Sequence, residues 1–242
     1  MGKLNSHWTG LSYTDVGLVR QLNEDSVLDK SAEQLWAVAD GMGGHSAGDY
    51  ASQTLINELE NFKSHALLAV CLKRHDSTVK NINSHLVDMA TENGQDAIGC
   101  TLASLLIFGN WAICSWSGDS RIYRLRDNKI KMLTRDHSQF CVNEDRNALF
   151  TANLRTYQPE ALTAAIGSGR NSHIERAWYV LDNDDIFLLC TDGMYKEISD
   201  VEIEQSLNVA LTDNDAVKVL SDIYYRNGAR DNIGLVIVSL KP

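Results

Sequence analysis

Four aspartates in this 242-residue chain stand at the border of an apolar run, beside a glycine or an asparagine. They are Asp40, Asp119, Asp192 and Asp231. Glycine lets the backbone approach a ligand closely, and carboxylate and carbonyl oxygens are the ligands that Mg²⁺, Mn²⁺ and Ca²⁺ prefer. A single Asp-Gly pair is more often an ordinary turn. Recurrence of the pattern at four predicted strand boundaries favours a site for hard cations.

The stretch around Asp40 shows this pattern most fully. The five residues 35–39 are apolar or aromatic, and the run stops at Asp40, which is followed at once by Gly41. Gly43 and Gly44 come directly afterwards. A short apolar run bounded by a turn signal is typical of a strand with both faces buried. We therefore expect Asp40 at the end of a stiff strand, beside accessible backbone carbonyls.

A second group of charged residues precedes this strand. Arg20 is followed by Asn23, Glu24 and Asp25. The guanidinium group is a rigid fork of donors that suits a phosphoryl group, and an acidic pair can hold metal-bound waters. A charged turn between two strands is an equally good interpretation.

With Glu24 and Asp25, the four aspartates make six candidate ligands for hard cations. Packed together without metal, these carboxylates would repel one another, and some of their pKa values would rise. Two cations about 3.5–4 Å apart would remove the repulsion and could clamp a phosphoryl group during hydrolysis. Spacing in the sequence alone leaves open whether the six residues meet.

Six motifs follow one another along the chain: R-x-x-N-E-D, A-D-G-M-G-G-H-x-x-G, G-D-S-R-x-Y, T-x-D-H-S, C-T-D-G and D-N-I. In this order they resemble the type-2C metal-dependent Ser/Thr protein phosphatases, the PPM family, in its bacterial single-domain form. The resemblance covers about residues 10–240. It implies an α+β fold, a four-layer α-β-β-α sandwich of two antiparallel sheets flanked by helices. We therefore expect a single phosphatase domain over residues 1–242.

The resemblance also implies roles for the acidic residues. Asp40 would bridge two Mn²⁺ or Mg²⁺ ions, and the backbone carbonyl of Gly41 would bind one of them. Asp192 and Asp231 would complete the shell of the second ion. Glu24 and Asp25 would act through metal-bound water. Asp119, together with Asp192, would bind a weaker third ion.

The implied reaction is the hydrolysis of phosphoserine or phosphothreonine in proteins. A water that bridges the two cations would attack phosphorus in line, while Arg20 grips the phosphate. His45 is a candidate general acid, because an unperturbed imidazole titrates near pH ~6.5, or else simply a neighbour of the glycine-rich loop. His137 is expected to be structural, bonding near a sheet edge. The implied partners are phosphorylated proteins and a cognate bacterial Ser/Thr kinase.

Periodicity predicts the elements that would position these residues. Apolar residues at helical spacing predict one helix over 48–63, a second that ends at about residue 90, and another over 214–226. Ser199 and Glu202 form a capping-box signature for a further short helix. Strand patterns and tight turns cover 99–108, 111–116, 121–126, 129–133, 185–190 and 233–238, with turns at 109–110 and 127–128.

Two regions carry weaker signals. His65, His75 and His85 recur at intervals of ten residues, which does not place them on one helix face, and we expect them at the surface. From 139 to 176 the pattern weakens, which indicates either a functional flap or a plain surface excursion. The flap motifs common in bacterial relatives are missing there, so substrate specificity is not transferred. Cys100 stands where relatives commonly carry Thr or Ser.

Composition narrows the function further. With 44% hydrophobic residues the chain can bury a large core, and its net charge of −10 argues against nucleic acid or an anionic membrane as a partner. The sequence shows neither a secretory signal nor an apolar run of about 18 residues, so we expect a soluble, cytoplasmic, monomeric protein. The five cysteines lack C-x-x-C spacing and are expected to be reduced thiols.

Two other functions compete with a protein phosphatase. One is a catalytically silent sandwich that serves as a binding or regulatory module. The presence of Asp40, Asp192 and Asp231 argues against it, because loss of metal ligands is what silences such a site. The other is a metal-dependent phosphatase for small phosphoesters, which would share the chemistry and differ only in the flap and the surface.

Overall fold

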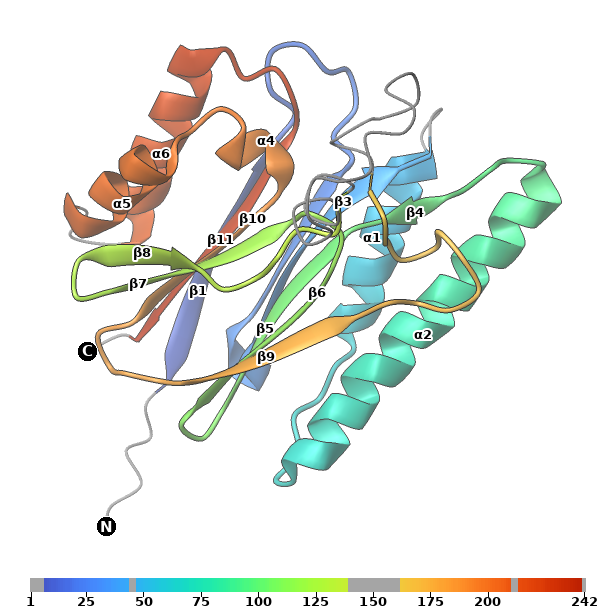
Figure 1. Ribbon diagram of the computed structural model, residues 1–242, viewed down its shortest axis with the longest axis horizontal. Helices are drawn as coiled ribbons and strands as arrows, with labels where there is room; N and C mark the ends of the chain where they lie inside the picture. Colours follow the sequence, from blue (N-terminus) through green and yellow to red (C-terminus); the bar gives the residue numbers. More distant parts are fainter. Residues whose placement is uncertain (1–6, 44–46, 139–161, 210–212, 241–242) are drawn as a thin grey trace, which may run out of the picture.

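The computed structural model describes residues 7–43, 47–138, 162–209 and 213–240. Two antiparallel β-sheets lie face to face, and helices cover the outer face of each (Figure 1). This arrangement confirms the predicted α+β class and the four-layer α-β-β-α sandwich. Within the described part of the chain, no helix is both long and apolar enough to cross a membrane.

Both sheets combine hairpins of consecutive strands with strands that are distant in the sequence. The first sheet has the order β1 (Trp8–Asp15), β11 (Ile233–Leu240), β10 (Ile186–Cys190), β7 (Arg121–Arg126) and β8 (Lys129–Met132). The second sheet has the order β2 (Asp25–Lys30), β3 (Leu35–Met42), β5 (Leu102–Phe108), β6 (Trp111–Ser117) and β9 (Glu175–Val180), with the short β4 (Gly99–Cys100) paired to β3. The hairpin turns fall where predicted, since Gly109, Asp127 and Asn128 have positive φ angles.

The helices also lie close to their predicted ranges. α1 (Ala47–Glu60) and α2 (Leu68–Asn93) cover the second sheet, whereas α4 (Asp192–Tyr195), α5 (Asp200–Val209) and α6 (Asp213–Asn227) lie on the first (Figure 1). The capping box forms as expected, because Ser199 and Glu202 bond to each other's backbone N–H groups and also side chain to side chain. A 3₁₀ turn, η1 (Ser31–Glu33), joins β2 to β3.

Strand β3 runs through the centre of the packing. Its residues 35–39 are fully buried, and their side chains alternate between two cores. Leu35 and Ala37 pack with α1 and α2, whereas Trp36 and Val38 pack between the two sheets. Burial of a large apolar side chain stabilises a fold by roughly 1.5–3 kcal/mol, so β3 anchors both layers. The predicted doubly buried strand is confirmed.

Two features differ from the sequence analysis. Strand β9 falls where no strand was assigned, although Ala177 and Tyr179 alternate toward the sheet–sheet core as a strand would. His75 is buried, with only 3% of its surface exposed, so its predicted place at the surface is wrong. The reason is a polar partner beneath the helix: His75 Nε2 lies 3.0 Å from Ser104 Oγ on β5. The four described cysteines are free and buried, as expected.

A polar network ties α2 to the second sheet. His75 Nδ1 lies 3.3 Å from a carboxylate oxygen of Asp76. Asp76 also forms an ion pair with Arg176 of β9, and the Arg176 guanidinium donates to Ser115 Oγ at 2.8 Å. The hydrogen bond with His75, followed by that with Arg176, lowers the pKa of Asp76 to about 2 from its ordinary 3.8. Asp76 therefore stabilises the docking of α2 only while it is ionised.

We predict that Asp76→Asn reduces the acid sensitivity of folding. Because the folded pKa is depressed, the stabilisation is present above pH 3.8 and is lost as the pH falls toward about 2. At neutral pH the variant should lose no more than about 1 kcal/mol, because the pair is partly exposed. Thermal melts of both proteins between pH 5 and pH 2 test this. Parallel melting curves in that window would contradict it.

Candidate metal centre

The antiparallel pairing brings the acidic residues to one end of the sandwich. Because β2 and β3 run in opposite directions, Asp25 lies directly across from Asp40. Asp192 follows the end of β10, and Asp231 precedes the start of the neighbouring β11. Asp119 lies where the chain leaves β6 and crosses to β7 in the other sheet. In Figure 1 the loop between β1 and β2 and the short α4 lie at this same end.

The glycines beside the aspartates make room for backbone. A Cβ atom on Gly41 would overlap the carbonyl of Gly48 at the start of α1, and one on Gly193 would overlap the carbonyl of Asn232. Neither glycine has a positive φ angle, so close packing and not turn conformation requires them. Gly118, in contrast, has φ +104°. Close packing therefore explains Gly41 and Gly193, and backbone conformation explains Gly118.

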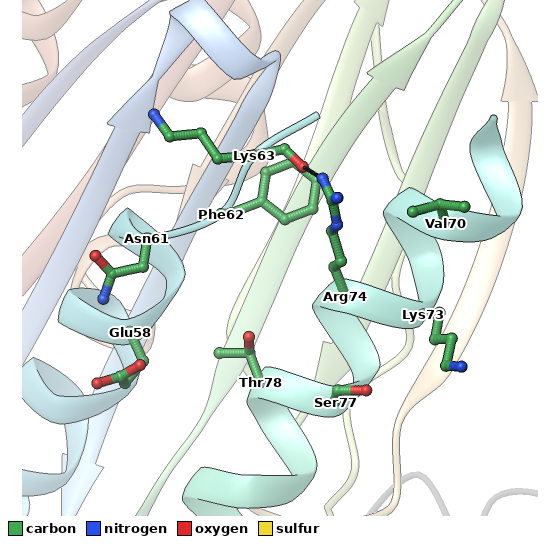
Figure 2. A pocket seen from close by; sticks show the side chains of 9 residues that line it. All are labelled: Glu58, Asn61, Phe62, Lys63, Val70, Lys73, Arg74, Ser77 and Thr78. Atoms are coloured by element: carbon green, nitrogen blue, oxygen red, sulfur yellow. Dashed lines mark hydrogen bonds between the residues drawn. The ribbon is translucent and has the colours of Figure 1, made fainter. Parts of the chain in front are cut away.

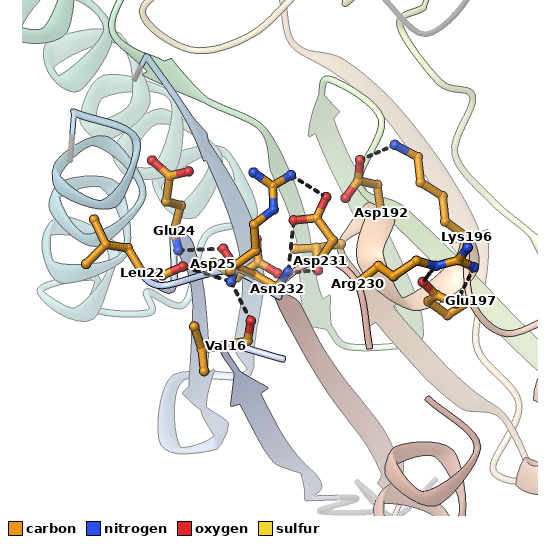
Figure 3. A network of polar contacts seen from close by, with 12 residues as sticks. Val16, Leu22, Glu24, Asp25, Asp192, Lys196, Glu197, Arg230, Asp231 and Asn232 are labelled. Carbon is orange, nitrogen blue, oxygen red and sulfur yellow. Dashed lines mark hydrogen bonds and ion pairs between the residues drawn. The ribbon is translucent and has the colours of Figure 1, made fainter. Parts of the chain in front are cut away.

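Buried donors fix the two residues that enter β2. Thr191 Oγ1 donates to the Asp25 carboxylate at 2.7 Å and accepts from Gly234 N at 2.8 Å. The side chain of Asn232 accepts from Glu24 N at 2.9 Å and donates to two carbonyls of the β1–β2 loop, as Figure 3 shows. The Thr191–Asp25 and Asn232–Glu24 bonds join residues 166 and 208 positions apart in the chain. Thr191 and Asn232 stand inside motifs that the sequence analysis quoted, but it gave them no role.

Thr101 connects the Asp40 and Asp119 segments. Its hydroxyl accepts from Asp40 N at 2.9 Å and lies 2.6 Å from Ser120 Oγ, and its own N–H donates to Asp40 O at 2.8 Å. The carbonyl of Asp119 accepts from Tyr195 Oη at 3.1 Å. The Asp40 and Asp119 backbones are therefore held before any ligand binds.

Crowding of the carboxylates changes their titration. Burial, followed by the charges of Asp25 and Asp192, raises the pKa of Asp40 well above its ordinary value. Burial also raises the pKa of Asp25, although the hydrogen bond from Thr191 opposes the change. Burial and the charge of Asp192 raise the pKa of Asp119 to about 6. Burial is the largest cause of all three shifts, and the charges of neighbouring carboxylates add the repulsion that was expected.

Two cations already pair with the cluster. Arg20 Nη2 lies 2.9 Å from Asp231 Oδ2, and Lys196 Nζ lies 2.6 Å from Asp192 Oδ2 (Figure 3). All candidate donors are carboxylate or carbonyl oxygens. Three of the carboxylates, Asp25, Asp40 and Asp119, carry their charge only against a burial penalty. That chemistry fits Mg²⁺ or Mn²⁺. His45 lies outside the described residues, so its predicted role receives no geometry.

A histidine cluster lies apart from these ligands. Nitrogens of His137 and His173 and an oxygen of Glu175 lie within 4.8 Å of one another. Gly118 N donates to His137 Nδ1 at 3.2 Å, so in the neutral ring Nε2 carries the proton and cannot bind a metal. His137 Nε2 lies 3.2 Å from Glu175, although the contact is not aligned as a hydrogen bond. His137 also donates from its backbone to Gly118 O, which agrees with its predicted structural role beside edge strand β9.

A pocket between α1 and α2 has a different character (Figure 2). Its lining residues include the cations Lys63, Lys73 and Arg74, together with the apolar Phe62 and Val70. Arg74 donates to the carbonyl of Lys63 at 2.6 Å and so supports the link between the two helices. Its lining includes no residue of the predicted site.

Fold and site together define a sandwich protein with a cluster of carboxylates at one end whose chemistry fits hard cations. The Protein phosphatase 2C family model matches residues 9–146, which is more than half of the chain. The chain belongs to the protein phosphatase 2C family, as the motif order indicated.

Curated relatives agree with this assignment. Protein phosphatase PhpP of Streptococcus pneumoniae is 30% identical over 247 residues, covering 94% of this chain and 95% of its own length. Serine/threonine protein phosphatase PstP of Mycobacterium tuberculosis is 29% identical over 94% of this chain, but the match spans only 44% of PstP. The chain thus corresponds to less than half of that relative.

Solved structures share the fold. PppA, described as a key regulatory component of T6SS in Pseudomonas aeruginosa, superposes with a TM-score of 0.89 at 32% identity, covering 98% of this chain and 99% of PppA. The catalytic domain of PstP in complex with two manganese ions gives a TM-score of 0.81 at 29% identity, covering 97% and 99% of the two chains. Both cover the two sheets and the helices on either side.

We predict that the metal-free protein loses stability as the pH rises. Because the folded pKa of Asp119 is raised from 3.8 to about 6, its contribution is present below pH 3.8 and lost as the pH rises through about 6. Each kcal/mol lost lowers the melting temperature by roughly 2–4 °C in a protein of this size. Melts in chelator between pH 4 and pH 8 measure the effect.

Asp119→Asn is the control for this experiment, because the amide cannot ionise and should flatten part of the pH dependence. Mn²⁺ added at pH 8 should restore the melting temperature of the wild type by neutralising the cluster. A melting temperature that does not change with pH in chelator would contradict the predicted repulsion.

Proposed function

We propose that this chain is a Mn²⁺- or Mg²⁺-dependent protein phosphatase that hydrolyses phosphoserine and phosphothreonine in proteins. The single observation that carries the proposal is the convergence of six acidic residues from five chain segments beside Arg20. The names of the curated relatives, which are Ser/Thr or protein phosphatases, support the same reaction.

Metal binding would use the residues that the resemblance implied. Asp40 and the carbonyl of Gly41 would hold the first ion, and Asp40, Asp192 and Asp231 the second. Glu24 and Asp25 would act through water, and Asp119 with Asp192 would form a weaker third position. When bound, such cations acidify a coordinated water and neutralise phosphoryl oxygens. The manganese-bound PstP catalytic domain supports the choice of metal.

The chain's own residues supply orientation. Arg20 is half-exposed at the rim of the cluster and reaches Asp231 with one nitrogen, which leaves other guanidinium donors for a phosphate. Thr191, Thr101 and Asn232 hold the ligand segments from behind, so the carboxylates need not reorganise when substrate arrives. His45 remains the proposed general acid.

The wider assignments are also proposals. We propose that residues 1–242 act as one catalytic domain, with a substrate-contacting flap within 139–176, of which the structure describes only 162–176. The partners would be phosphoproteins and an opposing Ser/Thr kinase, and the enzyme would work as a cytoplasmic monomer. These assignments rest on the motif resemblance.

We predict turnover of a phosphothreonine peptide that requires Mn²⁺ after chelation and collapses in Asp40→Asn. The expected loss is at least about 10³-fold, since one lost ligand perturbs both proposed ions. Asp88→Asn, at an exposed position of α2, is the matched control and should keep full activity. The proposal would be wrong if the folded protein hydrolysed neither this peptide nor p-nitrophenyl phosphate.

The same assay separates the two phosphatase hypotheses. A protein phosphatase should show the higher kcat/KM on the peptide, because surface beyond the phosphate contributes binding energy. A preference for small phosphoesters would favour the alternative function.

We predict that Arg20→Ala lowers kcat/KM by roughly 10²-fold, because the phosphate loses a charged donor in the transition state. The melting temperature should barely change, since the pair with Asp231 is exposed. Arg230→Ala is the matched control. Arg230 is exposed, directly precedes Asp231 in the chain and forms an ion pair of 2.7 Å with Glu197. Equal effects of both variants on kcat/KM would contradict a specific role for Arg20.

A further inference from the structure

Lys196 is a positive charge built into the acidic end of the sandwich. Its ammonium nitrogen lies 2.6 Å from Asp192 Oδ2, and Figure 3 shows the two side chains meeting above the short helix α4. Asp192 is the first residue of α4 and Lys196 follows its last, so the two are one helical turn apart. The backbone N–H of Lys196 donates to Asp192 O at 2.9 Å, which fixes this spacing.

The same helix places Lys196 near Asp119. Tyr195 donates from its hydroxyl to Asp119 O at 3.1 Å, so α4 is tied to the turn that carries this carboxylate. Lys196 is the next residue after Tyr195 and pairs with Asp192. It therefore joins one carboxylate of the proposed third-ion position to the helix that contacts the turn bearing the other.

A lysine ammonium is a compact point charge, and at this distance it takes a place on Asp192 that a divalent cation would otherwise use. The charge balance leads to the same conclusion. Two divalent cations together with Arg20 and Lys196 match the six carboxylates of the cluster. A third divalent cation would add unbalanced positive charge within a few ångströms of Lys196, which opposes its binding.

Arg20 differs from Lys196 in this respect. Its partner lies 211 residues away in the chain, on a separate loop, so Arg20 can leave Asp231 for a phosphate. Exposure does not distinguish the two cations, since the Arg20 and Lys196 side chains are 51% and 42% exposed. Lys196 is confined to the turn that also bears its partner, and its effective concentration at Asp192 stays high whatever is bound.

Resting on the proposed metal-dependent function, we infer that Lys196 is a tethered cation that competes with the divalent ion at Asp119 and Asp192. It weakens binding at this position, and it keeps the cluster partly neutral when metal is scarce. The chain therefore works with two tightly bound ions, and the third is bound only at high metal concentration.

Calorimetric titration of Mn²⁺ into chelator-stripped protein tests the inference without measuring turnover. Lys196→Met removes the charge and keeps most of the stem, and it should bind its weakest Mn²⁺ about tenfold more tightly than the wild type. Lys196→Arg keeps the charge and should titrate as the wild type does. Lys80→Met removes an exposed charge from α2 and should leave every site unchanged.

The outcomes separate this inference from the proposed function. Unchanged Mn²⁺ affinities in Lys196→Met, or an equal gain in Lys196→Arg or Lys80→Met, would overturn the competing role while Mn²⁺-dependent turnover of the wild type stands. Absence of Mn²⁺ binding to the wild type would overturn both.

Discussion

Burial and mutual repulsion of carboxylates shape the acidic end of this sandwich. Burial deprives Asp25 and Asp40 of hydration, and each faces the charges of the others, so both resist ionisation. Hydrophobic packing must hold them together against this repulsion. The fully buried strand β3, which anchors the outer helices on one face and the second sheet on the other, supplies the rigid support for Asp40.

Hydrogen bonds from the surrounding backbone and side chains hold the repelling carboxylates in place for ligand binding. Thr191 and Asn232 join the start of β2 to the far end of the chain, and Thr101 joins the Asp40 and Asp119 segments. Close backbone packing at Gly41 and Gly193 brings these segments nearer than any side chain would permit. In a site fixed in advance, the electrostatic cost of bringing the carboxylates together arises during folding. A cation or a phosphoryl group then binds without a further cost of reorganising the site.

Fixed cations moderate the same repulsion. Arg20 pairs with Asp231 from an exposed loop and can exchange this partner for a phosphate, whereas Lys196 is held beside Asp192 on one helical turn. The two pairs differ in sequence separation, which is 211 residues for Arg20 and Asp231 and four for Lys196 and Asp192. Membership of the protein phosphatase 2C family accounts for the acidic ligands, whereas the placement of Lys196 is read from this chain's own structure.

The sequence by itself determined the four-layer fold class, the buried β3 strand, the hairpin turns and the identity of the acidic residues, because periodicity and motif order are local properties. Only the tertiary structure decided that Asp25 faces Asp40, that His75 is buried against Ser104 and that 175–180 forms edge strand β9. It also showed that Gly41 is required for space and not for its φ angle. Each of these features depends on which distant segment packs against the residue. The spacing of side chains along one strand or helix does not specify that neighbouring segment.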